Sequence, residues 1–115
     1  MPGRKIFTAA LYLAVFSAVV CLLKVSVLQA ETNARELYMM HCKTCHGPDG
    51  KPTDLGQGLE ARDFTDPQWQ AKATDEQIIK QIIDGTPDKM FSFKDKLSEE
   101  EIKALVPIVR SFGKK

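Results

Sequence analysis

The sequence predicts an all-α fold, and three observations support this prediction. No stretch shows the alternation of apolar and polar residues that is typical of a half-buried strand. Capping boxes at residues 74–77 (TDEQ) and 98–101 (SEEE) each precede apolar residues at helical spacing. A third helical pattern covers residues 33–41. We therefore expect about three to four helices packed around one core.

The first thirty residues predict a signal peptide or an N-terminal membrane anchor. Arg4 and Lys5 form a basic start, residues 6–23 carry no charge, and Ala30 is a small residue at the expected junction. The uncharged run exceeds the usual signal core of about 7–15 residues and reaches the roughly 17–25 that can span a bilayer. Cleavage after Ala30 and membrane anchoring through residues 6–23 therefore both stay open. Residues 31–115 form the expected domain.

The composition of that domain excludes some functions. Without the first thirty residues, 13 basic and 15 acidic residues remain, well mixed along the chain. Nucleic-acid binding, which needs a clustered basic face, is not expected. A domain of this size has a thin core, and a buried cofactor would supply missing apolar surface.

The elements of the domain follow from local signals. Thr32 is predicted to cap a helix over 33–41, which leads directly into Cys42. Glycine and proline residues make 47–66 a long loop, with a short turn near 59–61. After the first capping box, an isoleucine-rich helix of about ten residues ends before Gly85. The second box starts a final helix, in which Pro107 removes one backbone hydrogen bond and should produce a kink.

Residues 42–46, CKTCH, form the Cys-x-x-Cys-His pattern that attaches a c-type haem. Two thiols at this spacing can reach the two vinyl groups on one porphyrin edge, and the following imidazole can coordinate the iron. Cys42 and Cys45 are therefore predicted to hold one haem c covalently, with His46 as an axial ligand. Because haem c is a redox cofactor, the motif predicts an electron carrier.

Met90 is the predicted second axial ligand. It lies 44 residues after His46, in a turn-rich loop over 85–91 that can bring a thioether to the far face of the ring. Met39, Met40 and His41 stand too close to the motif to reach that face. A His/Met pair raises the potential relative to His/His, because thioether sulfur favours Fe(II).

Together these features resemble the class I mono-haem cytochromes c of the small bacterial exported type. The resemblance covers residues 32–115 and rests on the helix entering CKTCHGPDG (42–50), on ARDF (61–64), on the GTPDKM loop (85–90) and on VRSF (109–112). It implies a cytochrome c fold, with terminal helices crossing near one covalently bound haem. The implied function is one-electron transfer between membrane or soluble redox enzymes.

The resemblance also implies roles around the cofactor. Trp69, just before the isoleucine helix, is expected to pack by the haem with its N–H on a propionate. A proline carbonyl commonly orients the axial histidine in this family, and Pro48 and Pro52 are both available. Phe91 stands where proline often follows the ligand, which softens the loop. The expected apolar lining consists of Phe64, Ile79, Ile83, Phe93 and Leu97.

We expect a monomer that meets redox partners in small, transient contacts, located in the periplasm or exported, or anchored at the outer face of the inner membrane. Five lysines near the motif and the Met90 loop either steer an acidic partner or are ordinary solvated side chains: Lys43, Lys51, Lys89, Lys94 and Lys96. The sequence shows no paired carboxylates in a recognisable setting and no nucleophile with a base. We therefore do not expect an enzyme.

Three rival functions remain. The first is a haem sensor or peroxidase-like protein in which Met90 leaves the iron. The second is a dithiol oxidoreductase, which needs a strand before the motif. The third is a structural zinc site, for which the remaining ligands are missing.

Overall fold

The computed structural model describes the backbone of residues 3–114 and divides the chain into two compact units, Met1–Ala30 and Glu31–Lys115. Helix α1 (Gly3–His41) begins in the first unit and ends in the second. The side chains of Arg4, Lys5 and Ala30, on which the signal prediction partly rests, lie outside the described residues. Cleavage after Ala30 stays a prediction.

In the first unit, α1 is helical throughout, and its side chains from Thr8 to Lys24 are exposed. No helix in the described part of the chain is both long and apolar enough to cross a membrane. The expected helix start at residue 33 was wrong, because α1 already runs through this position. Residues 4–41 contain neither glycine nor proline, so nothing in this stretch interrupts the helical backbone. The predicted cap depended on the side chain of Thr32, which also lies outside the described residues.

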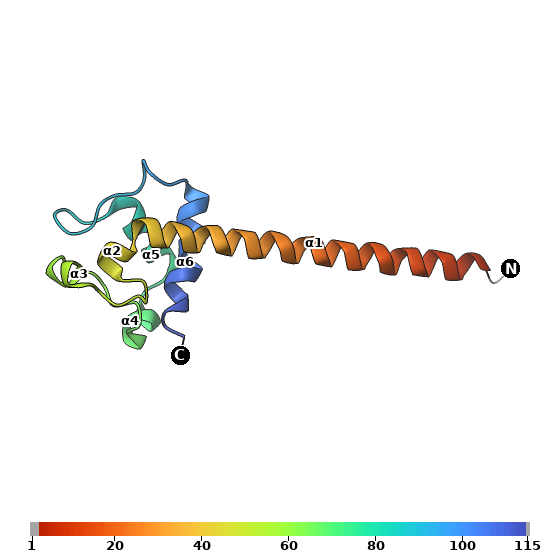
Figure 1. The fold of residues 1–115 in the computed structure, drawn as a ribbon, viewed down its shortest axis with the longest axis horizontal. Coiled ribbons are helices and arrows are strands. Elements are labelled where there is room, and N and C mark those ends of the chain that lie inside the picture. Colours follow the sequence, from red (N-terminus) through yellow and green to blue (C-terminus); the bar gives the residue numbers. More distant parts are fainter. Residues whose placement is uncertain (1–2, 115) are drawn as a thin grey trace. The chain divides into compact units, whose positions relative to one another are not determined.

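The second unit adds five helices to the end of α1: α2 (Lys43–His46), α3 (Asp54–Gly58), α4 (Pro67–Lys72), α5 (Asp75–Asp84) and α6 (Glu99–Ser111) (Figure 1). No strand occurs within residues 3–114, which confirms the all-α prediction. The helix number exceeds the expected three to four because α2, α3 and α4 are one or two turns long. Such short helices lack the apolar periodicity that reveals longer ones.

Both predicted capping boxes form. Thr74 Oγ1 accepts from the N–H of Gln77, whose side chain accepts from the N–H of Thr74, and Ser98 and Glu101 repeat this arrangement. The isoleucine helix α5 has the expected ten residues and ends at Asp84, directly before Gly85. Helix α6 continues through Pro107, which lies on its exposed side.

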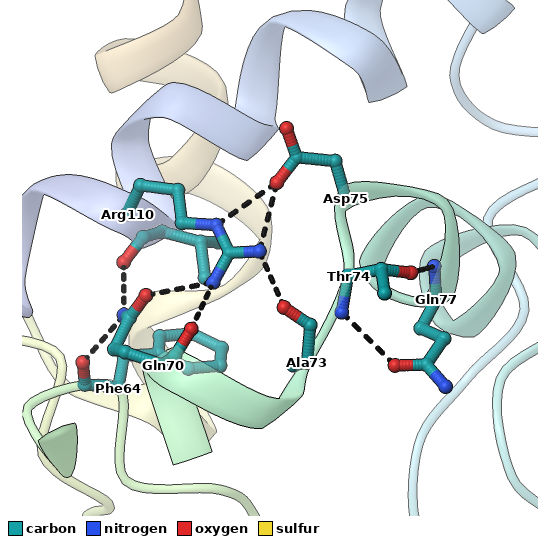
Figure 2. Close-up of polar contacts among 8 residues, drawn as sticks. Phe64, Gln70, Ala73, Thr74, Asp75, Gln77 and Arg110 are labelled. Carbon is teal, nitrogen blue, oxygen red and sulfur yellow. Dashed lines mark hydrogen bonds and ion pairs between the residues drawn. The ribbon is translucent and has the colours of Figure 1, made fainter. Parts of the chain in front are cut away.

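The core of the second unit lies between α1, α5 and α6. Helix α5 packs against α6, and the largest fully buried side chains are Tyr38, Ile102, Leu105 and Ile108. Tyr38 packs on Phe112 with ring centroids 5.0 Å apart. Arg110 joins α6 to the α4–α5 segment through the hydrogen bonds drawn in Figure 2. This frame holds the loops that carry the predicted site.

Candidate functional site

A cavity of about 410 Å³ lies within the second unit, and its lining residues run from Tyr38 to Val109. Its volume falls in the range of roughly 300–1,000 Å³ that is usual for cofactor and small-molecule sites. Side chains from α1, α4, α5, α6 and the loops between them contribute to the wall, and most of this wall is apolar. All five predicted site residues line it: Cys42, Cys45, His46, Trp69 and Met90.

The Cys-x-x-Cys-His motif forms one helical turn at the end of α1. The N–H of Cys42 donates to the carbonyl of Tyr38 at 2.8 Å, and the N–H of His46 donates to the carbonyl of Cys42 at 2.9 Å. This turn directs both cysteines and the histidine to the same cavity. Because α1 precedes the motif, the strand that a dithiol oxidoreductase would need is absent from the described residues.

The two motif cysteines are free thiols and are half-buried. Burial, reinforced by the nearby Cys45, raises the pKa of the Cys42 thiol to about 11. A reactive dithiol needs the opposite shift, because the thiolate is the attacking species. This burial therefore disfavours thiol–disulfide exchange at Cys42.

His46 is oriented by the carbonyl of Arg62, which lies 3.1 Å from its Nδ1. Neither Pro48 nor Pro52, the two expected candidates, supplies this contact in the structure. Burial lowers the pKa of His46, although the hydrogen bond with Arg62 acts in the opposite direction, so the neutral imidazole is favoured. A neutral ring that donates from Nδ1 presents Nε2 as the coordinating atom.

The ring of His46 also stacks on Phe64, with centroids 4.2 Å apart and planes 12° from parallel. Trp69 in α4 lies against the same phenylalanine, at 5.2 Å between centroids. Helix α4 was not expected from the sequence, although Asp66 as a cap followed by Pro67 at the first helical position is a recognised start signal. The aromatic wall of the cavity is thus built by α2, α4 and the loop between α3 and α4.

Met90 lies in a tight loop closed by backbone hydrogen bonds. The N–H of Thr86 donates to the carbonyl of Met90 at 2.8 Å, and the N–H of Met90 donates back at 2.9 Å. Gly85, with φ of +67°, starts this loop, and a Cβ there would lie 2.4 Å from the carbonyl oxygen of Met90. The loop presents a half-buried methionine to the cavity.

The apolar lining differs in part from the prediction. Phe64 and Phe93 line the cavity as expected, whereas Leu97 is buried in the core away from it. On α5 the lining residues are Ile78 and Ile82, not the predicted Ile79 and Ile83. The four isoleucines form two adjacent i, i+4 pairs, and the sequence pattern alone cannot say which pair faces the cavity. Gln77 and Gln81, which directly precede Ile78 and Ile82 in the sequence, also line the cavity.

Comparisons with known proteins agree on one class. The family model described as "Cytochrome C oxidase, cbb3-type, subunit III" matches residues 29–107. A curated relative, "Cbb3-type cytochrome c oxidase subunit FixP" of Azorhizobium caulinodans, is 31% identical over 84 residues, which are 73% of this chain. The chain spans only 28% of the length of that relative.

Two solved structures are similar in sequence and in fold. The "KustC0563 c-type cytochrome" is 63% identical with a TM-score of 0.69, and the match covers 70% of this chain and 98% of the other. A tyrosine-to-phenylalanine mutant of the same protein is 61% identical with a TM-score of 0.68 and the same coverage.

Proposed function

Since this chain belongs to the family of cytochrome c oxidase, cbb3-type, subunit III, we propose that residues 31–115 carry single electrons on one covalently bound haem c. Electron transfer is the role of c-type cytochromes in this oxidase-like family. The identities of the iron ligands and of the redox partners are part of the proposal. The observation that carries the proposal is that two thiols, an imidazole and a thioether line one apolar cavity.

The residues present fit the proposed cofactor. Cys42 and Cys45 would hold the haem through thioether bonds, His46 and Met90 would be the axial ligands, and the indole N–H of Trp69 would serve a propionate. Haem c supplies one-electron redox chemistry when it is bound. The protein contributes a neutral imidazole fixed by the Arg62 carbonyl, a soft thioether fixed by the Thr86–Met90 pairing, and apolar walls that limit water.

This arrangement supports electron carriage over ligand sensing. A carrier works best when coordination stays the same in both oxidation states, and the two backbone hydrogen bonds between Thr86 and Met90 favour a fixed ligand. The alternative, a sensor or peroxidase-like protein with a labile Met90, has one supporting observation: Phe91, the residue after Met90, is 79% exposed. We propose that the chain has no enzymatic activity of its own.

We further propose a monomer in the periplasm, or otherwise exported, that meets redox partners transiently, with residues 6–23 as a signal core or anchor. The relative FixP is named as an oxidase subunit, which supports contact with a redox complex. The lysines divide into two groups. Lys89 pairs with Glu60, and Lys96 lies over the Phe91 ring at 5.7 Å between Nζ and centroid, so both have partners within the chain. Lys43, Lys51 and Lys94 are exposed and are the better candidates for steering an acidic partner.

Optical spectra of the oxidised and reduced holoprotein test the ligand pair. We expect the weak far-red charge-transfer band of Met–Fe(III) in the wild type and its loss in Met90→Ala. Met40→Ala is the matched control, because Met40 lies on α1, is 70% exposed and does not line the cavity. Covalent haem without the band in the wild type, together with tight carbon monoxide binding by the reduced protein, would instead support the sensor.

A further inference from the structure

Gln81 makes a contact that neither the sequence motifs nor the proposed function assigns. Its Nε2 lies 3.5 Å from Met90 Sδ and 2.8 Å from Thr86 Oγ1. A side-chain amide has two N–H donors, so it can serve both acceptors at once, and thioether sulfur is a weak acceptor. The proposed iron ligand therefore has a hydrogen-bond donor on its coordinating atom.

The local backbone fixes both partners of this contact. Gln81 stands in the last turn of α5, and its carbonyl accepts from the N–H of Gly85 at 2.8 Å. The antiparallel backbone pairing of Thr86 with Met90 then reverses the chain direction, so that Met90 lies beside the end of α5. Met90 follows Gln81 by nine positions in the sequence, yet both residues line the cavity.

We propose that Gln81 is a positioning and tuning residue for the iron, acting through a hydrogen bond from its side-chain amide to the sulfur of Met90. The inference rests on the proposed function, in which Met90 is an axial ligand. A hydrogen bond withdraws electron density from the sulfur lone pairs and makes the thioether a poorer donor. Weakening the sulfur donor removes more stabilisation from Fe(III) than from Fe(II), so this contact raises the reduction potential.

A purely structural role predicts something different. Gln81 also holds the loop through Thr86, and loss of that bond alone would loosen the loop without changing the electron density on sulfur. The two roles can be separated because the amide has a different acceptor for each. Thr86→Val removes the Oγ1 acceptor and leaves the contact with sulfur in place.

The experiment compares the holoprotein with Gln81→Leu and Thr86→Val in two measurements, the midpoint potential and the energy of the far-red Met–Fe(III) band. Gln81 is exposed, so an apolar substitution should still fold. Gln81→Ala, the strongest helix former and without a side-chain donor, is the second variant if the leucine variant fails to fold. We expect a lower potential and a shifted band in the Gln81 variants, and clearly smaller changes in both measurements in Thr86→Val.

Equal changes in Gln81→Leu and Thr86→Val would show that Gln81 acts only through the loop and would overturn the inference. Wild-type potential and band in both Gln81 variants would overturn it as well, while leaving the His46/Met90 pair intact. The absence of the band in the wild type, or its persistence in Met90→Ala, would overturn the proposed ligand pair and this inference with it.

Discussion

The guanidinium of Arg110 in α6 donates both to the backbone carbonyl of Gln70 in α4, at 2.8 Å, and to its side-chain Oε1, at 3.0 Å (Figure 2). Gln70 in turn donates from Nε2 to the carbonyls of Phe64, at 2.8 Å, and Val109, at 3.0 Å. Phe64 is the ring on which His46 stacks. The C-terminal helix therefore holds the cavity wall behind the proposed axial histidine.

Arg110 should contribute measurably to stability. Arg110→Met keeps the aliphatic stem but removes donors to partly buried oxygens, so we expect a loss of about 2 kcal/mol in the free energy of unfolding. The ion pair with Asp75 adds little to this, because that carboxylate is 59% exposed. Denaturant unfolding of the holoprotein measures the effect. Lys103→Met, at an exposed position on the same helix, should change stability by less than about 0.5 kcal/mol. An equal loss in both variants would contradict the role of Arg110.

Gly56 and Gly58 form a matched pair for a steric test. A Cβ on Gly56 would lie 1.9 Å from the carbonyl oxygen of Cys45, whereas nothing lies within 4 Å of a Cβ on Gly58. Gly56→Ala should cost about 1–3 kcal/mol, because the backbone of the Cys-x-x-Cys-His motif has to move. Gly58→Ala should be neutral or slightly stabilising, since alanine is the better helix former. Unfolding free energy and haem incorporation yield are the measurements, and similar values for the two variants would refute the argument.

Thr53 links the motif to α3 through one hydroxyl. Its Oγ1 donates to the carbonyl of Thr44 at 2.7 Å and accepts from the N–H of Gly56 at 3.1 Å, as the cap of α3. Thr53→Val keeps the shape and loses both bonds, so stability should fall by about 1 kcal/mol. Thr53→Ser keeps the hydroxyl and should retain most of that stability. Thermal and denaturant unfolding distinguish them, and a serine variant as unstable as the valine variant would argue that the methyl group matters instead.

Trp69 can be tested for a role beyond packing. Trp69→Phe keeps an aromatic ring beside Phe64 but removes the indole N–H. If that N–H serves a propionate, its loss leaves more negative charge near the iron, favours Fe(III) and lowers the midpoint potential. Voltammetry of both holoproteins measures the shift. Reduced stability with an unchanged potential would leave Trp69 as a packing residue only.

Several elements could be predicted because their signals are local. The capping boxes at Thr74 and Ser98 form as expected, and α5 ends directly before Gly85. The resemblance to mono-haem c-type cytochromes, drawn from motifs in their order, is confirmed by the family match and by the similarity to a solved c-type cytochrome. The ligand roles of His46 and Met90 stay predictions.

Other features depend on contacts between distant parts of the chain. No local signal indicates that the carbonyl of Arg62 meets His46 sixteen residues away, and the proline carbonyls were the natural expectation. The choice between the two isoleucine pairs of α5 depends on how the helix packs against α6. The turns α3 and α4 are too short for periodicity to show them.

By itself, the sequence determined the helical class and the turn-rich loop that carries Met90, and it predicted that residues 42–46 attach a haem. Capping, turn formation and motif spacing depend on residues that are close in sequence, so they can be recognised in the sequence itself. Only the tertiary structure decided which carbonyl orients His46, which face of α5 lines the cavity, and that Gln81 reaches the sulfur of Met90. These are properties of packing, in which the position of each side chain depends on all of its neighbours.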